Sequence, residues 1–283
     1  MFTGLIEHAG RVVSLESIEG GDGRGLIYGA LSVAEALRNG TPLREIRASR
    51  ETPRLELRLP TDDDLLVLAA VARAGVHHLP DTPFLVPWDE LPSPAFERQF
   101  LLHWWQVRGS WSPGDWTLGL AVLAEGRPIG VQDLMARDFA HRRTVGTGSW
   151  LGLEHQRQGY GTEMRAAVLW LAFEELGALV AESGYVNGNE ASARVSSKLG
   201  YVPNGERLIA PTGTAVTEHE VRVTPESWRR NRVPVAVEGL EPCRGLFGEQ
   251  DLPATAWATV TPAEARRKLP ALNRPTRPSG LRV

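Results

Sequence analysis

The fold prediction begins with residues 149–161, which read SWLGLEHQRQGYG. An apolar strand leads into a turn that contains Gly159 and Gly161, and a helix with an apolar side leaves directly afterwards. The first turn of a helix has unpaired N–H groups and a partial positive charge. Glycine lets the backbone approach a phosphate closely because it has no Cβ. The stretch therefore indicates either a diphosphate site or a plain strand-to-helix turn, in which glycine is also common.

Upstream of this turn the pattern first alternates and then becomes helical. The leucines that alternate with polar residues, as in a half-buried strand, are Leu55, Leu57 and Leu59. Thr61 then precedes a helix with an acidic first turn, where acids complement the helix dipole. A second helix is expected to reach about Arg108, and the residues on its apolar face are Phe96, Phe100 and Trp104.

The remaining periodicities predict a sheet covered by helices. Strands at 117–124 and 128–135 are joined by Glu125-Gly126-Arg127, which predicts a hairpin. A longer strand is expected over 144–153, before the turn. The elements expected after it are a helix to Leu176, a strand at 179–183, a helix at 189–199 and a strand pair within 201–223. This order favours an α/β (α+β) fold with a mixed, mostly antiparallel central sheet flanked by helices.

The two ends of the chain differ from this central unit. Residues 1–48 are glycine-rich, with Gly20, Gly21, Gly23 and Gly25 close together, and are expected to form a flexible N-terminal extension. Residues 249–283 contain five prolines and little apolar periodicity, so an irregular tail is expected there. One domain is therefore predicted at 49–248.

Composition narrows the classes of function. The net charge is -3, and the 31 basic and 34 acidic side chains are scattered, so a nucleic-acid partner is disfavoured. Cys243 is the only cysteine, which excludes an internal disulfide and a cysteine-based metal site, and no histidine pair has zinc spacing. We predict no metal. The start lacks a signal peptide and no run approaches the ~20 apolar residues of a membrane span, so a cytoplasmic protein is expected.

Two motifs resemble those of the GNAT superfamily of acyltransferases. Residues 156–161, QRQGYG, match its Q/R-x-x-G-x-G/A pyrophosphate motif. Residues 189–192 and 198–201, NEAS and KLGY, are similar to its later N-x-x-S … K-x-G-F/Y stretch and follow in the right order. The likeness covers roughly residues 50–248 and is greatest to the ribosomal-protein-acetyltransferase branch, including an actinobacterial succinyltransferase that binds succinyl-CoA.

The resemblance implies a GNAT fold and an acyl-CoA cosubstrate, with no permanently bound cofactor. An acetyl or succinyl group would pass to a primary amine, such as a protein N-terminus, a lysine or a small molecule, by direct attack in a ternary complex. A homodimer is consistent with the family. The alternative is a non-catalytic acyl-CoA sensor or interaction module on the same fold, because fold alone does not determine function.

The resemblance also implies roles for individual residues. The residues expected to hold the CoA diphosphate are Gln156, Arg157, Gln158, Gly159, Tyr160, Gly161 and Thr162. Leu151 and Leu153 would pair with pantetheine as an added strand. Asn189 and Ser192 would lie near the thioester, where Ser192 would protonate the departing thiolate.

The acceptor pocket and the general base are less well defined by the sequence. The residues predicted for the substrate pocket are Trp88, His103, Gln132 and Ser149, with further tryptophan walls at Trp104, Trp105 and Trp150. The candidate bases are Glu154, Glu163, Asp133, His103 and His141, each of which can equally be a solvated or hydrogen-bonded side chain. The candidate cations for a succinyl carboxylate are Arg137, Arg142, Arg143 and His103.

Overall fold

The computed structural model describes residues 6–7, 11–12, 45–50, 52–79, 82–84, 86–231 and 235–248. The chain divides into residues 1–249 and residues 250–283, and every described residue belongs to the first unit. Strands β1 (Ile6–Glu7) and β2 (Arg11–Val12) pair antiparallel with each other. Most of the expected N-terminal extension and the whole proline-rich tail lie outside the described residues, so both remain predictions.

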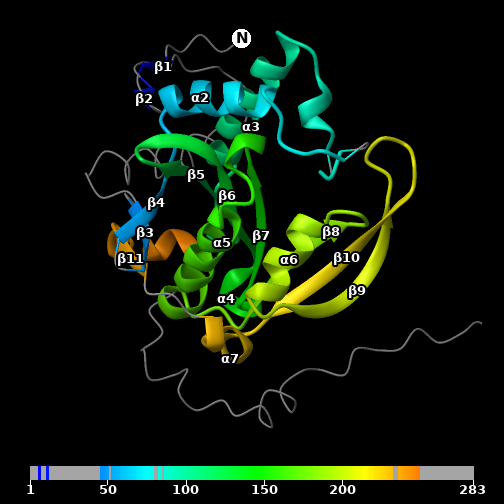
Figure 1. Cartoon of the computed structure of the whole chain (residues 1–283). Helices are drawn as coiled ribbons and strands as arrows, with labels where there is room; N and C mark the ends of the chain where they lie inside the picture. The colour runs from blue at the N-terminus through cyan, green and yellow to red at the C-terminus, as the bar shows by residue number, and fades with distance from the viewer. Residues whose placement is uncertain are drawn as a thin grey trace, which may run out of the picture. The chain divides into compact units, whose positions relative to one another are not determined.

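Nine strands of the described chain form one sheet in the order β11-β3-β4-β5-β6-β7-β8-β10-β9 (Figure 1). Their bounds are β3 Glu45–Arg50, β4 Thr52–Arg58, β5 Asp115–Ala124, β6 Arg127–Arg137, β7 Thr144–Leu151, β8 Val180–Val186, β9 Val202–Ile209, β10 Val216–Val223 and β11 Val235–Glu238. Neighbouring strands are antiparallel except β7 and β8, which run parallel. The predicted mixed, mostly antiparallel sheet is confirmed.

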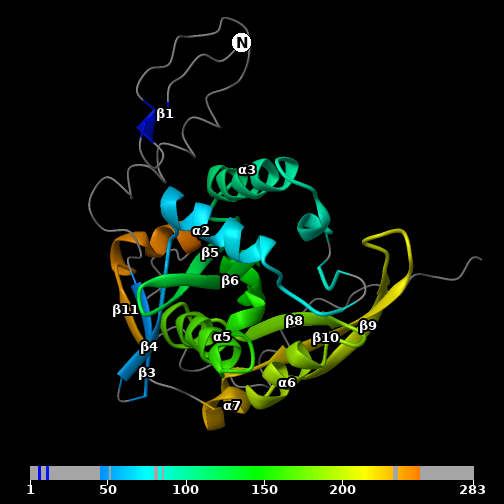
Figure 2. The same cartoon turned by 45° about the horizontal axis from the view of Figure 1, so that its top comes forward.

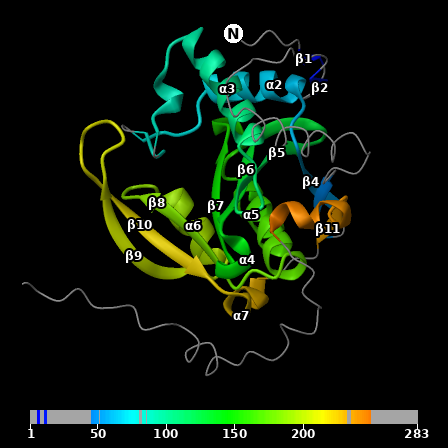
Figure 3. The ribbon, with the colours of Figure 1, turned by 180° about the vertical axis from the view of Figure 1, so that it is seen from behind.

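Helices cover both faces of this sheet (Figures 2 and 3). The helices on one face are α2 (Asp62–Arg73) and α3 (Ala95–Gly109). The main helices on the other face are α5 (Tyr160–Trp170) and α6 (Glu190–Lys198). The shorter helices are α4 (Phe139–Arg142), α7 (Pro225–Trp228) and the 3-10 segments Trp88–Glu90, Leu153–His155, Arg229–Asn231 and Glu241–Phe247.

Two apolar layers hold the helices to the sheet. Successive strand residues point to opposite faces, so alternate positions enter different layers. The strand residues buried toward α5 include Leu55, Leu57, Leu118, Leu120, Leu134 and Val145. The strand residues buried toward α2 and α3 include Ala121, Leu123 and Val131, which pack with Phe96, Phe100 and Trp104 as the helical spacing predicted. The buried Leu55 and Leu57 confirm the alternating pattern of that segment.

The predicted hairpin is confirmed, and the backbone geometry of its turn explains why two residues are enough to join the strands. Glu125 and Gly126 link β5 to β6 with φ values of 51° and 75°. Positive φ at both central residues is the requirement of a type I′ turn, whose twist matches that of the flanking strands.

Two of the predicted elements, a strand and a helix, end at other residues than expected. The strand expected to reach Leu153 ends at Leu151, because the Leu153 N–H donates to the Gly75 carbonyl at 3.0 Å and draws the chain out of the sheet. The helix expected to run to Leu176 changes at Leu171 into a π-helical turn, Leu171–Glu175, in which the Leu176 N–H bonds to the Leu171 carbonyl at 2.9 Å.

Strands β3 and β11 were not predicted from the sequence. They pair with each other at one edge of the sheet, although they lie far apart along the chain. β3 also pairs with β4 and crosses the expected boundary between residues 48 and 49. Short edge strands of this kind depend on pairing rather than on a local pattern.

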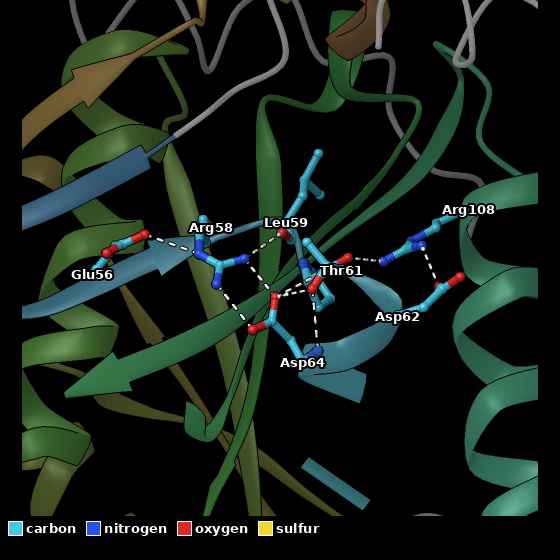
Figure 4. A network of polar contacts seen from close by, with 8 residues as sticks. Glu56, Arg58, Leu59, Thr61, Asp62, Asp64 and Arg108 are labelled. Carbon is cyan, nitrogen blue, oxygen red and sulfur yellow. Dashed lines mark hydrogen bonds and ion pairs between the residues drawn. The ribbon is translucent and has the colours of Figure 1, made fainter. Parts of the chain in front are cut away.

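A polar network fixes the start of α2 (Figure 4). The Thr61 side chain accepts from the Asp64 N–H at 3.2 Å, and the Asp64 carboxylate accepts from the Thr61 N–H at 2.7 Å, which forms a capping box. Arg58 of β4 donates to both Asp64 oxygens, at 2.5 and 2.9 Å. Burial by itself raises the pKa of Asp64, but the hydrogen bonds from Arg58 and Thr61 outweigh it and hold the pKa below its usual value.

The network predicts a stability loss for Asp64→Ala. We expect the free energy of unfolding to fall by about 2 kcal/mol at neutral pH, because both the cap and the charged hydrogen bonds are removed. The lowered pKa means that this contribution exists above the unfolded pKa of about 3.9 and disappears as pH falls through the folded pKa. Urea unfolding of Asp64→Ala and of the exposed control Asp63→Ala tests this. Equal losses in the two variants would contradict the assignment.

Candidate functional site

The site is created where β7 and β8 separate. The two strands pair in parallel only from Thr144–Gly146 against Val180–Glu182. Beyond that point a cavity of about 870 Å³ lies between them, bounded by the start of α5 and by α6. At its closed end the Thr147 hydroxyl donates to the Glu182 carbonyl at 3.4 Å, and the Ser183 hydroxyl donates to the Thr147 carbonyl at 3.2 Å. The remaining part of β7 therefore offers an open strand edge.

The turn before α5 forms a backbone concavity at the open end of this cavity. Arg157 and Gly159 have φ values of 61° and 90°, so two left-handed residues lie within three positions. Within the described part of the chain, the backbone N–H groups of residues 157–161 have no acceptor. Such a turn at a helix N-terminus binds anions, since consecutive N–H groups and the helix dipole point the same way. Arg157, Gly159, Gly161 and Thr162 line the cavity.

Side chains behind the turn hold its shape. Arg54 of β4 donates to the Gln158 carbonyl and to the Glu163 carboxylate, each at 3.2 Å, and lies 4.9 Å from the centre of the Tyr160 ring. The Gln156 amide donates to the Leu151 and Val76 carbonyls at 2.9 and 2.8 Å. Gln156, Gln158 and Glu163 thus position the turn with their side chains, and Glu163 is engaged in an ion pair.

Helix α6 forms the wall opposite β7. Asn189 is its N-cap, and its side-chain oxygen accepts from the Ser192 N–H at 3.1 Å. Both residues line the cavity, and Ser192 is half-buried. The cap explains why asparagine and serine occur three positions apart, since Asn189 satisfies one of the free N–H groups of the first turn.

The sequence reasoning missed Arg165 of α5. This residue lines the cavity but is only 5% exposed. Its guanidinium donates to the Ser196 hydroxyl of α6 at 3.1 Å and to the Ser149 hydroxyl of β7 at 3.2 Å. The signal in the sequence was a charged residue inside the apolar run 164–169, all of which is buried.

Asp133 of β6 lies on the opposite side of the sheet, toward α3. Its cross-strand neighbours are Gly119 and Gly148, so no side chain covers it from either strand. The Trp104 ring lies over Gly119, within 2.6 Å of the position that a Cβ there would take. Among the described residues, the Asp133 carboxyl group has no hydrogen-bond or ion-pair partner. Burial raises its pKa to about 7.

A cluster of aromatic side chains borders the cavity on the α3 side of the sheet. The rings of Phe84 and Trp150 line it, and Trp88 packs against them with centroid distances of 5.0 and 5.7 Å. Trp88 therefore supports the wall from behind. Trp104 is buried, whereas Trp105 is exposed.

Other predicted residues lie away from the cavity wall. Gln132 is fully buried on the α5 side of the sheet and donates to the Gly148 carbonyl at 2.8 Å. His103 is on the exposed side of α3, and Leu153 is in the 3-10 turn after β7. The other predicted bases and cations that do not line the cavity are Asp133, Glu154, Glu163, His141, Arg137, Arg142 and Arg143.

Carboxylates line the part of the cavity that β8 and β10 form. Glu182 of β8 lines it together with Glu218 and Glu220 of β10. Arg207 of β9 forms ion pairs with both β10 glutamates. Among the residues that the structure describes, no helix is long and apolar enough to cross a bilayer, and no cluster of His, Cys, Asp or Glu is arranged to hold a metal ion.

Comparison with known proteins identifies the family. A model of the acetyltransferase (GNAT) domain matches residues 54–202, just over half of the chain. Solved structures with a similar fold include a GCN5-related N-acetyltransferase from Brucella melitensis (22% identity, TM-score 0.51, 67% of this chain and 82% of that chain covered). Another is a GNAT-family acetyltransferase from Bacillus anthracis (17%, 0.51, 64% and 99%).

A third similar structure is that of RimJ from Mycobacterium smegmatis in complex with CoA-disulfide, at 17% identity and a TM-score of 0.50, with 64% of this chain and 86% of that chain covered. Identities this low show a shared fold. The match to the family model shows more, since it spans the turn before α5, the strand β7 and the helix α6 that form the cavity. The chain therefore belongs to the GNAT acetyltransferase family, and it is an acyltransferase that uses an acyl-CoA cosubstrate.

Proposed function

We propose that this protein transfers an acetyl group from acetyl-CoA to a primary amine by direct attack in a ternary complex. The observation that carries the proposal is the continuity of one cavity. The cavity runs from the free N–H groups of residues 157–161, along the open edge of β7, to Ser192 of α6 and to Gly148, beside which the Asp133 carboxyl group lies. Anion binding, thioester placement and a base are thereby arranged along a single path.

The cosubstrate follows this path from the anion-binding turn inward. The diphosphate lies against the N–H groups at the start of α5, and the pantetheine arm pairs with β7 from Leu151 toward Gly146 as an added strand. Ser192 faces the arm from α6 and assists the departing sulfur. Asn189 acts indirectly, because its side chain holds the Ser192 N–H.

The acceptor enters from the α3 side of the sheet. The cavity there is lined by Trp150, Met135 and Glu182, and Glu182 forms no ion pair among the described residues, so the three side chains suit a cationic amine with an aliphatic stem. An alkylammonium has a pKa near 10.4 and must lose a proton before it attacks. Asp133 is the proposed base, since it is ionised above pH 7, lacks another partner and lies beside Gly148 of the cavity wall.

Acetyl is proposed because none of the four cations that the sequence suggested for a succinyl carboxylate lines the cavity, and Arg165, a buried cation that does, is held by Ser149 and Ser196. A succinyl carboxylate would need a cation or several hydrogen-bond donors. None of Arg137, Arg142, Arg143 or His103 lines the cavity. Arg143, for example, donates to the Leu176 carbonyl at 3.1 Å instead.

The proposal predicts acetyl-CoA turnover with amine acceptors. Release of free CoA thiol is measured with acetyl-CoA or succinyl-CoA and a panel of peptide N-termini, lysine peptides, polyamines and small amines. We expect amine-dependent release, faster with acetyl-CoA than with succinyl-CoA. Thermal shift with CoA, and with NAD as the control nucleotide, gives binding separately from turnover. Tight CoA binding with no thiol release in any arm would favour the non-catalytic acyl-CoA module.

Gly161→Val tests the position of the diphosphate and pantetheine. Gly161 is helical, and a Cβ there would meet Val195 at 3.5 Å, so the backbone tolerates a side chain. The valine methyl groups would enter the cavity, and we expect the Kd for CoA to rise at least ~10-fold. Calorimetric titration measures this.

Gly109→Val is the matched control, because a Cβ at that position of α3 meets nothing within 4 Å. Gly159 is less suitable for substitution, since its φ of 90° would add backbone strain. An unchanged CoA affinity in folded Gly161→Val would place the cosubstrate elsewhere.

Asp133→Asn tests the base. With an acceptor amine whose own pKa lies far above 7, the kcat/KM of the wild type should rise through an apparent pKa of about 7. In Asp133→Asn this limb should vanish and kcat should fall by ~100-fold or more. The exposed Asp115→Asn is the control.

Protein stability separates this outcome from misfolding. Because the folded-state pKa of Asp133 is raised, its ionised form costs stability as pH rises through the folded value of about 7. Asp133→Asn should therefore melt at the same temperature as the wild type or higher at pH 8. A persistent limb near pH 7 in this variant would refute the role of Asp133.

A further inference from the structure

Arg165 carries a buried charge that has no role in the acetyl transfer proposed above. Its guanidinium bonds to two neutral hydroxyls, and its Nε–H has no partner within the described chain. Burying a cation without a carboxylate costs several kcal/mol, and burial lowers the pKa of Arg165, although arginine stays protonated in proteins. A cation in this state on a cavity wall is suited to an anion that arrives with the substrate.

The position of Arg165 indicates which part of the cosubstrate it meets. An extended pantetheine arm of about 15 Å spans four to five strand residues, because each residue advances ~3.3 Å. Counted from the end of β7 at Leu151, the arm carries its sulfur to about Thr147, two positions past Ser149, which is one of the two hydroxyls that Arg165 holds. Its other partner, Ser196, lies one turn along α6 from Ser192. Arg165 also interacts electrostatically with Tyr201, whose hydroxyl lies 3.3 Å from the Thr147 hydroxyl. The CoA diphosphate, in contrast, lies at the first turn of α5.

The sulfur is where negative charge appears in the reaction. The amine nitrogen, which has already given one proton to Asp133, attacks the thioester carbon. The C–S bond breaks and its electron pair goes to sulfur, while the second proton on nitrogen is lost to solvent. A serine hydroxyl is a much weaker acid than a thiol, so proton transfer from Ser192 to the thiolate is uphill. Ser192 can donate a hydrogen bond, but the negative charge stays on sulfur until solvent protonates it.

We propose that Arg165 stabilises the CoA thiolate as the leaving group, so that the sulfur departs as an anion rather than as a protonated thiol. The inference rests on the proposed acyl-CoA site and adds a second charge to it. A buried cation that is fixed close to a developing anion lowers the barrier without reorganisation. The hydrogen bonds to Ser149 and Ser196 fix the guanidinium between β7 and α6.

Other groups near Arg165 do not replace this charge. The Tyr201 hydroxyl, which lies 3.3 Å from the Thr147 hydroxyl, interacts electrostatically with Arg165. Burial raises the pKa of Tyr201, so it remains neutral. Glu182 of β8 also lines the cavity, but it shows no ion pair with Arg165 among the described residues.

The test measures the pKa of the CoA thiol in its complex with the whole protein. Thiolate is followed by ultraviolet absorbance as pH is varied, and the Kd values of CoA and desulfo-CoA, which lacks the thiol, are compared at each pH. We expect the bound thiol to titrate about one unit or more below free CoA, so that CoA gains affinity over desulfo-CoA by ~10-fold across that range.

Variants assign this shift to Arg165. In Arg165→Met the thiol pKa should return to that of free CoA, whereas Arg165→Lys should retain part of the shift. Arg194→Met is the control, because Arg194 is an exposed arginine on the same helix as Ser196 and lines the same cavity. If Arg165→Met does not fold, Arg165→Gln keeps hydrogen-bonding capacity but removes the charge.

Two outcomes would overturn the inference. One is a wild-type complex in which the bound thiol titrates no lower than free CoA. The other is an unaltered thiol pKa in a folded Arg165 variant that lacks the charge. Either result leaves the proposed function intact as long as CoA and desulfo-CoA bind, whereas failure of both ligands to bind would refute the proposed function itself.

Discussion

The divergence of β7 and β8 is the constraint on which the rest of the site depends. Three residue pairs hold the strands together, and the Thr147 and Ser183 hydrogen bonds end the contact. Every later backbone group on that edge of β7 needs another partner, since unpaired strand edges are costly when buried. In the proposed complex, the amides of the linear pantetheine arm supply such a partner, and the arm completes the sheet that the two strands leave open.

This arrangement requires support from outside the strands. The turn before α5 is tied to β4 by Arg54 and to the end of β7 by Gln156. Helix α6 is oriented by the Asn189 cap and joined to α5 and β7 through Arg165. These hydrogen bonds connect the elements that form the walls of the cavity. They keep the walls apart at a fixed spacing, which is what a preorganised binding site needs.

Local patterns predicted most of the fold, because its main elements carry their own periodicity. The leucine alternation of β4, the apolar face of α3 and the Glu125-Gly126 turn each specify their element without tertiary information. The edge strands β3 and β11 escaped prediction since pairing between distant segments creates them. The early end of β7 likewise depends on a bond from Leu153 to Gly75, a contact that no local pattern encodes.

The parts of the site that depend on backbone geometry could be predicted from the sequence. The parts that depend on the direction of side chains could be predicted less well. Glycine spacing located the left-handed turn before α5, and Asn189 located the start of α6, since both have positional rules. Gln132 was assigned to the acceptor pocket because it is polar in an apolar strand, yet its side chain points toward α5. Asp133, one position later, points toward α3. Neighbouring residues of a strand point to opposite faces of the sheet. Only the register with β5 and β7 shows which face each residue of β6 occupies.

The same alternation separates the two charges that the proposed mechanism uses. Along β7, Ser149 points toward α5 and contacts Arg165, whereas Gly148 points the other way and leaves space for Asp133 from β6. A carboxylate and a guanidinium in direct contact would form an ion pair, and neither would then be free to act. In the proposed mechanism the sheet lies between them, so that the carboxylate accepts the amine proton on one face while the guanidinium stabilises sulfur on the other. The thioester, proposed to lie at the strand edge, is then within reach of both faces.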